Sequence, residues 1–360
     1  MRSAGRVVRI SVAMVVFAVS LEFWARVDDY LTYDAPFWGR YNSQMLYIRD
    51  TLGQRGKPNA RYRKWKLNEL GFRGPAIRHD RINVLCFGAS ETFGLYESEG
   101  QEYPRLLERK LNEHAGSDAY QVVNAAYPGE SAFTAVVRVP ELIDAIHPRI
   151  AIVYPTPADY IWLPYLHPAE PPPQSAEALF DFRMGERLRT FVKGLLPERL
   201  QSWLREQEIR RGAAAFAVMD RLPDENVRQF HDDVAHLVQT LRDRGVLPVV
   251  VTHASSFGPT LSEDDRRLLI SWRKFYPMLK EDGFLDMERR MNETLRAVAT
   301  EQDVPLIDAA AQIPPTRQNF ADFVHFTNRG AEVMAETLTR GLMPIVQAHL
   351  QASSTRKGAE

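Results

Sequence analysis

The sequence has a single cysteine among its 360 residues and almost no net charge. Cys86 has no partner for an intramolecular disulfide, and it lies in an apolar run where a buried thiol behaves as a small hydrophobic side chain. The 45 Lys and Arg nearly balance the 46 Asp and Glu, so the chain has no overall field that attracts nucleic acid. A short basic run at residues 61–66, RYRKWK, does not change this balance, and we expect no nucleic-acid partner.

The sequence also lacks the signatures of common cofactor and metal sites. Residues 88–94 do not have the glycine spacing of a dinucleotide-binding loop. His231 and His236 are five residues apart, which does not place them on one helix face, and His253 ends a predicted strand with no partner in view. We therefore expect neither a metal nor a cofactor, and we expect structural roles for these histidines.

No uninterrupted run of twenty apolar residues is present, but a shorter one lies near the N-terminus. The uncharged core at residues 10–21 follows three arginines, and with its apolar flanks the segment 7–27 is long enough to cross a membrane once. We predict a signal anchor over residues 1–27, with the N-terminus inside and the rest of the chain outside the cytoplasm. Cleavage near residues 18–20, or an amphipathic helix of a soluble protein, are the alternatives.

Beyond residue 80, short apolar strand patterns alternate with helical patterns. We predict strands at 82–87, 120–124, 149–154, 246–252 and 304–307, and helices at 103–114, 132–146, 225–244, 286–302 and 331–347. Strands separated by crossover helices form parallel sheets. The expected fold is a three-layer α/β/α sandwich of the flavodoxin-like type around a central parallel sheet.

The rest of the chain divides around this domain. We predict an N-terminal extension that wraps the domain at 28–80, the domain itself at 81–350, an inserted helical cap at 161–224 and a disordered tail at 351–360. Within the cap, a Pro-rich stretch precedes helical patterns at 188–204 and 213–219.

Ser90 follows the first predicted strand after a single turn that contains Gly88. Two interpretations are open: Ser90 caps the next helix, or it is a nucleophile at the edge of the sheet where ligands bind in open α/β folds. Far downstream, Asp322 precedes His325 by one helical turn, a spacing that lets the carboxylate orient the imidazole. Taken alone, the pair favours a solvated loop pair or a structural histidine, because short separations between an acidic residue and a histidine often arise by chance.

Taken together, four blocks resemble the SGNH (GDSL-type) hydrolase family. They are GASETFG at 88–94, NAAYPG at 124–129, TPAD at 156–159 and DFVH at 322–325, in the order that the family uses, and the resemblance covers most of residues 82–347. The phrase LNELGFRG at 67–74 is similar to the lead-in of membrane-anchored bacterial members. The resemblance therefore implies an inner-membrane anchor with the catalytic domain on the periplasmic or extracellular side.

The resemblance also implies roles for individual residues. Ser90 is the expected nucleophile, His325 the general base and then acid, and Asp322 the group that orients His325. The backbone N–H groups of Ser90 and Gly129 are the expected oxyanion donors.

The third block departs from the family pattern. Thr156, Ala158 and Asp159 are expected to line the site, but Ala158 stands where the family has an asparagine whose amide holds the oxyanion. Loss of one such donor typically lowers turnover by about a hundred- to a thousand-fold. A hydroxyl from Thr156, or a donor from the inserted cap, is a candidate replacement. Ala89 also replaces the acidic residue of the first block, where no chemistry is expected.

Three functions are carried forward from the sequence. The leading hypothesis is a membrane-anchored extracytoplasmic serine esterase that hydrolyses a small acyl ester, for example an O-acetyl group on a glycan. The second is a polysaccharide O-acyltransferase that uses the same residues. The third is a catalytically weak protein that kept the fold for binding or assembly, and Ala158 is the feature that motivates it.

Overall fold

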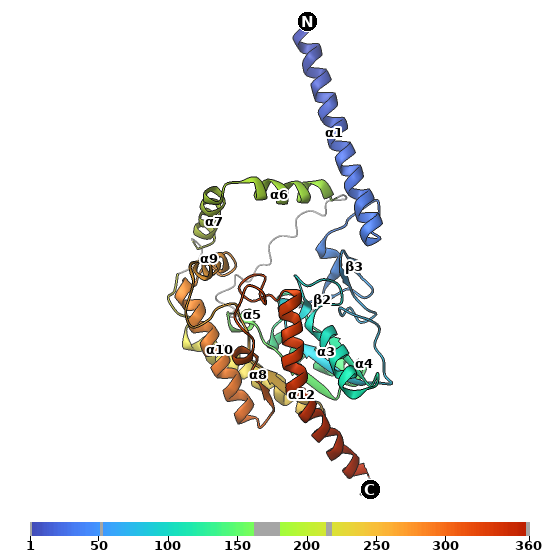
Figure 1. Cartoon of the computed structure of the whole chain (residues 1–360), viewed down its shortest axis with the longest axis vertical. Coiled ribbons are helices and arrows are strands. Elements are labelled where there is room, and N and C mark those ends of the chain that lie inside the picture. Colours follow the sequence, from blue (N-terminus) through green and yellow to red (C-terminus); the bar gives the residue numbers. More distant parts are fainter. Residues whose placement is uncertain (1, 51–52, 162–180, 214–217, 358–360) are drawn as a thin grey trace.

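The computed structural model describes residues 2–50, 53–161, 181–213 and 218–357. At its centre, five parallel strands form one sheet in the order β6-β5-β7-β8-β9 (Figure 1). The strands are β5 (Ile82–Phe87), β6 (Tyr120–Asn124), β7 (Ile150–Val153), β8 (Leu247–Val251) and β9 (Leu306–Ile307). This order reverses between the first two strands, which is the flavodoxin-like arrangement, and it confirms the predicted fold class.

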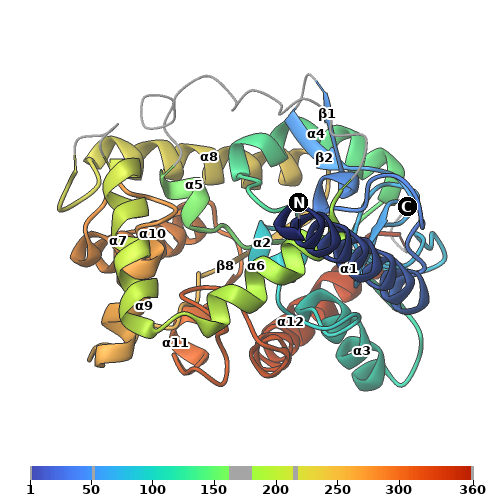
Figure 2. The ribbon, with the colours of Figure 1, turned by 90° about the horizontal axis from the view of Figure 1, so that it is seen from above.

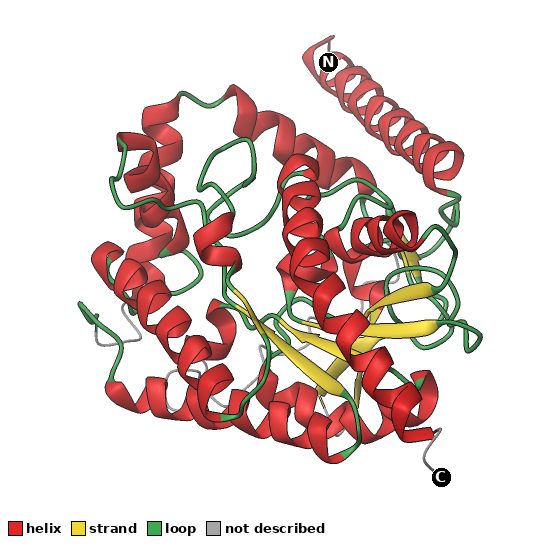
Figure 3. Ribbon diagram, turned by 60° about the horizontal axis from the view of Figure 1, so that its bottom comes forward, coloured by secondary structure: helices red, strands yellow, loops and turns green. Residues whose placement is uncertain are grey.

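Helices cover both faces of the sheet (Figure 3). One face packs against α3 (Tyr103–Ala115) and α12 (Asn328–Lys357), and the other against α4 (Ala132–Ile146), α8 (Asp224–Asp243) and α10 (Glu281–Glu301). Alternate residues of β5 belong to the two cores: Leu85 and Phe87 to one, Val84 and Cys86 to the other. A strand buried on both sides reads as a continuous apolar run, which is why the sequence located it accurately.

The N-terminal helix α1 (Arg2–Tyr33) projects away from the domain along the long axis of the molecule (Figure 1). Its segment Val8–Tyr33 is long and apolar enough to cross a membrane, with a mean hydropathy of 1.8, and only 6% of its apolar stretch is buried. The helix continues past residue 27, where the sequence placed the end of the anchor. An N-terminal signal sequence passes the same test, so length and composition alone do not fix the role of α1.

The extension that follows contains little regular structure. A 3-10 helix, η1 (Ser43–Leu46), precedes two antiparallel hairpins, β1 (Tyr47–Asp50) with β2 (Gly53–Gly56), and β3 (Arg61–Tyr62) with β4 (Trp65–Lys66). Its buried residues form a small core together with Phe93 and Ala126 of the domain. The extension therefore packs beside the first two sequence blocks that the family resemblance singled out.

The insertion and the C-terminus differ from the sequence-based expectations. The helix expected at 188–204 is two helices, α6 (Arg183–Leu195) and α7 (Glu198–Ala213), because Pro197 cannot continue the first one. Of the helix expected at 213–219, residues 214–217 lie outside the described part of the chain, and Met219 instead pairs with Leu279. The tail expected to be disordered from residue 351 is helical through Lys357.

Four further helices lie in the described part of the chain. The sequence did not predict α9 (Glu263–Trp272), which begins at a Ser262 capping box, because its short apolar pattern gives a weak periodicity. The other three are short: α5 (Pro157–Ile161) and α11 (Ala309–Gln312) follow β7 and β9. The third, α2 (Ser90–Phe93), follows β5 and carries the candidate nucleophile.

Candidate active site

Ser90, His325 and Asp322 meet at the carboxyl edge of the sheet. Ser90 Oγ lies 2.9 Å from His325 Nε2, and His325 Nδ1 lies 2.8 Å from Asp322 Oδ2. Ser90 and His325 are separated by 235 positions in the sequence, so the fold alone creates this contact. The exposed ring of Tyr96 lies beside His325, with the ring centroids 5.3 Å apart.

The turn after β5 places Ser90 at the first position of α2 rather than at its cap. The cap residue is Ala89, and the Ser90 side chain points to His325 and Glu91 instead of bonding to the start of the helix. Gly88 makes the turn tight enough, because a Cβ at this position would lie 2.1 Å from Thr92 Oγ1. The capping interpretation of Ser90 is therefore wrong.

Asp322 holds His325 through both its side chain and its backbone. Its Oδ1 accepts hydrogen bonds from the N–H groups of Val324 (3.0 Å) and His325 (2.9 Å), so the carboxylate shapes the loop as well as the imidazole. Burial acts to raise the pKa of Asp322, but the hydrogen bonds from His325 outweigh it and the pKa falls. Burial acts to lower the pKa of His325, and the bond to Asp322 and the charge of Glu91 outweigh it, so that pKa is raised.

A second set of charged groups lies behind the nucleophile. Ser90 Oγ lies 3.0 Å from Glu91 Oε2, and the other oxygen of Glu91 lies 3.6 Å from His253 Nε2. His253 Nδ1 in turn lies 2.9 Å from Glu288 Oε2, and all three of these ionisable side chains are buried. Burial acts to lower the pKa of His253, but Glu288 and Glu91 outweigh it and raise the pKa to about 10. We call Glu91, His253 and Glu288 the buried acid–histidine network.

The sequence analysis missed this network. It noted that His253 ends a strand, but the nearest partner is on α10, 35 positions away, which no local spacing reveals. The sequence offers one indication of this network: Glu91 follows Ser90 directly, so an acidic side chain lies beside the candidate nucleophile. Among the described residues, no cluster of three or more His, Cys, Asp and Glu side chains is arranged to hold a metal ion.

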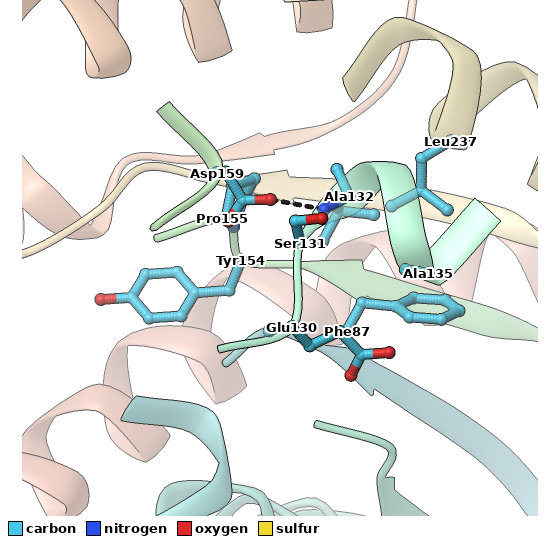
Figure 4. A pocket seen from close by; sticks show the side chains of 11 residues that line it. Phe87, Glu130, Ser131, Ala132, Ala135, Tyr154, Pro155, Asp159 and Leu237 are labelled. Carbon is cyan, nitrogen blue, oxygen red and sulfur yellow. Dashed lines mark hydrogen bonds between the residues drawn. The ribbon is translucent and has the colours of Figure 1, made fainter. Parts of the chain in front are cut away.

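Asp159 connects the third sequence block to Ala132, the first residue of α4, as Figure 4 shows. Its carboxylate accepts hydrogen bonds from the backbone N–H of Ala132 and, at 2.7 Å, from that of Thr156. Burial raises the pKa of Asp159 to about 7, with these two bonds acting in the opposite direction. The Thr156 hydroxyl is directed at the same carboxylate (3.4 Å), so it is not positioned as the replacement donor considered for Ala158. A donor from residues 162–180 of the cap lies outside the described part of the chain.

The second block brings Gly129 to the surface on a turn with φ +81°, a left-handed conformation that favours glycine. No heavy atom lies within 4 Å of the position where a Cβ would be, so the peptide is open on that side. Within the described residues, neither the Gly129 nor the Ser90 N–H donates a hydrogen bond. Asn124 fixes the two blocks to each other, since its amide donates to Thr92 O of α2 at 2.8 Å.

Arg73 of the extension holds the other end of α2. It is buried, pairs with Glu102 at 3.0 Å, and donates to Phe93 O at 2.7 Å. The side chain of Asn68 folds the preceding loop by accepting from the N–H groups of Leu70 (3.0 Å) and Phe72 (2.9 Å). The phrase at residues 67–74 therefore acts as a clamp on the helix that carries Ser90.

With this geometry established, comparisons with known proteins define the class of protein. The profile of the GDSL-like lipase/acylhydrolase family matches residues 86–333, and the chain belongs to this family of ester-hydrolysing enzymes. A search of curated proteins finds no match.

Several solved structures are similar to this chain. One is the lipase/acylhydrolase from Enterococcus faecalis, which is 14% identical, with 72% of this chain and 95% of that chain covered and a TM-score of 0.42. Another is a catalytic mutant of an acetylxylan esterase from Geobacillus stearothermophilus, which is 13% identical, with 73% and 94% covered and a TM-score of 0.43.

Proposed function

We propose that this protein is a membrane-anchored extracytoplasmic serine esterase that hydrolyses a small acyl ester through an acyl-serine intermediate. The observation that carries the proposal is the 2.9 Å contact between Ser90 Oγ and His325 Nε2, with Asp322 on the other nitrogen of the imidazole. Nucleophile, base and orienting carboxylate in this arrangement perform acyl transfer on several unrelated folds.

In the proposed mechanism, His325 accepts the Ser90 proton as Ser90 Oγ forms a bond to the ester carbonyl carbon. The N–H groups of Ser90 and Gly129 stabilise the negative charge on the carbonyl oxygen. His325 then returns the proton to the leaving alcohol, the acyl group remains on Ser90, and water attacks with the same proton transfers in reverse order. No cofactor or metal takes part in these steps.

The anchor is assigned to α1. Its apolar segment Val8–Tyr33 is scarcely covered by the rest of the protein, and arginines precede it. Arginines on the N-terminal side favour that end in the cytoplasm, which supports a catalytic domain on the outer side of the inner membrane.

The substrate is proposed as a small acyl ester, for example an O-acetyl group on a glycan. This choice rests on the family to which the chain belongs, whose members cleave esters. Transfer of the acyl group to a sugar hydroxyl would use the same residues and differs only in the acceptor that attacks the acyl-serine.

Labelling with a fluorophosphonate probe tests the mechanism. The probe forms a bond to an activated serine, so we expect the full-length protein in detergent to be labelled and the Ser90→Ala variant to remain unlabelled. Equal labelling of both proteins, or of neither, would contradict the acyl-serine mechanism and favour a binding role. Release of acetate from an acetylated oligosaccharide, compared with its transfer to an added oligosaccharide, then separates the esterase from the acyltransferase.

A further inference from the structure

Helix α6 has an apolar face that the described part of the protein leaves uncovered. Leu188, Phe191, Val192 and Leu195 recur at the spacing of one helix face, and their exposed fractions are 52%, 64%, 45% and 67%. We call these four residues the α6 apolar face. Soluble surfaces rarely keep such a continuous apolar stripe in water, so it indicates a contact with an apolar partner.

The start of α6 is fixed to the membrane helix. The Glu22 carboxylate of α1 accepts hydrogen bonds from the first N–H groups of α6, those of Arg183 (3.3 Å) and Met184 (2.9 Å). Arg187 forms ion pairs with Asp28 (2.8 Å) and Asp29 (2.6 Å) at the end of α1. The carboxylate of Glu22 at the N-terminus of α6, together with the ion pairs of Arg187, holds α6 against the part of α1 between Glu22 and Asp29.

This part of α1 lies at the C-terminal end of the segment 7–27 that we expect to cross the membrane. Glu22 and Arg26 lie in the last turns of this segment, and Asp28 and Asp29 follow it directly, so these charged residues mark the zone in which a membrane-spanning α1 passes from the bilayer into the headgroups. Figure 1 shows α6 crossing the direction of α1 at this end of the helix, and Figure 2 shows the same two helices from above. With α1 along the membrane normal, α6 lies in the plane of the membrane surface.

The catalytic edge of the sheet lies on the same side of the domain. Helix α12 begins three residues after His325 and runs away from α1 to the opposite end of the molecule (Figure 1). The start of α12, and with it the loop that carries His325, therefore lies toward the end of the domain that carries α1 and α6.

We propose that α6 is an interfacial membrane helix, with the α6 apolar face in the headgroup and acyl boundary of the bilayer beside α1. The inference rests on the proposed anchoring by α1. The bilayer is the occupant because α6 begins where the apolar helix α1 leaves the membrane. In addition, the exposed Arg189 lies about 160° around the helix from Phe191, on a side of α6 that suits contact with water and anionic headgroups. Two membrane contacts fix the orientation of the domain, so its catalytic edge faces the membrane surface.

Site-directed spin labelling of the full-length protein tests the proposal. Cys86 is the only cysteine and is buried, so a Cys86→Ser background allows single labels. We would place nitroxides at Phe191→Cys and Arg189→Cys, two positions apart on opposite sides of α6, in vesicles of phosphatidylcholine and phosphatidylglycerol. Collision with oxygen reports the bilayer, and collision with a water-soluble nickel complex reports water.

We expect the label at position 191 to collide several-fold more with oxygen than with nickel, and the label at 189 to show the reverse. Nickel accessibility at 191 equal to that at 189, or protection of 191 from both reagents by a protein surface, would overturn the inference. A label at Phe17→Cys in α1 separates the two proposals, because bilayer exposure at 17 without exposure at 191 leaves the anchor intact and refutes the interfacial helix. Leu195→Cys provides a second position if the 191 variant does not fold.

Discussion

Replacing Glu91 with glutamine tests whether the buried acid–histidine network acts on the chemistry. Ser90 Oγ lies 3.0 Å from Glu91 Oε2 and 2.9 Å from His325 Nε2, so the carboxylate is within about 6 Å of the imidazole. A unit charge at that distance contributes roughly 3 kcal/mol at an effective dielectric constant of about 20, and the positive charge of His253 cancels part of it. We take about half of that value, near 1.4 kcal/mol, as the net effect after this cancellation. It corresponds to a tenfold change in the proton affinity of His325.

The sign of the effect follows from the roles of the groups. His325 must be unprotonated to accept the Ser90 proton, and the negative charge of Glu91 raises the pKa of His325, which keeps it protonated to higher pH. In Glu91→Gln, the acidic limb of kcat/KM should therefore move to lower pH by about one pH unit. The plateau should fall by up to about tenfold, because the protonated imidazole that forms during the reaction loses a neighbouring negative charge.

The assay is a pH–rate profile of kcat/KM with a small chromogenic acyl ester, measured on detergent-solubilised full-length protein. Glu108→Gln is the matched control, because Glu108 is also a buried carboxylate with a backbone partner, Val122 N at 3.0 Å, but it lies on α3. The control should lose stability without a change in the acidic limb. An acidic limb of Glu91→Gln that coincides with that of the wild type, in a folded variant, would refute the reasoning.

Two further predictions concern the same site. Ala158→Asn should raise the rate of fluorophosphonate labelling by up to about a hundredfold, by restoring a third oxyanion donor; no gain would mean that another group already occupies that position. His253→Gln should lower the free energy of unfolding at pH 7 by about 3 kcal/mol, because it leaves Glu91 and Glu288 buried without a positive partner. Since the pKa of His253 is raised to about 10, its contribution is fully present below about pH 6.5 and is lost as the pH rises through 10. Urea unfolding curves at pH 7 and pH 10 measure the difference, which should shrink at the higher pH.

The sequence predicted most of the sheet because its strands are buried on both faces. The strands expected at 82–87 and 120–124 have the predicted bounds, and α4 formed despite Pro140 because its apolar positions face the core. The insertion was harder to predict. Helix α6 is stabilised by contacts with α1, which is far away in sequence. Its first N–H groups donate to the carboxylate of Glu22, and no local sequence pattern predicts where such a helix begins.

The candidate site also has residues that could be predicted from the sequence and residues that could not. Ser90, Asp322 and His325 were identifiable because each sits in a short block, and the order of the blocks is itself a signal. The buried acid–histidine network was not identifiable, because His253 and Glu288 come from separate elements and meet only through tertiary packing. Thr156 was one of two candidate replacement donors, and its hydroxyl lies 3.4 Å from Asp159 Oδ2, a contact that depends on the local turn and not on residue type.

The third block, residues 156–159, keeps the hydrogen bonds that hold the local structure but has no side-chain amide to stabilise an oxyanion. Asp159 ties the turn after β7 to the start of α4, whereas Ala158 has no side-chain donor for an oxyanion. In the proposed mechanism, the transition state carries a negative charge on the substrate oxygen and a positive charge on His325. Loss of the amide weakens stabilisation of the first charge, and Glu91, close to Ser90, strengthens stabilisation of the second. A carboxylate there also repels the oxyanion, and His253, held protonated by Glu288, limits that repulsion. In the proposed mechanism, the positive charge of His253 beside Glu91 therefore limits a repulsion that the oxyanion hole, without an amide at position 158, would offset less well.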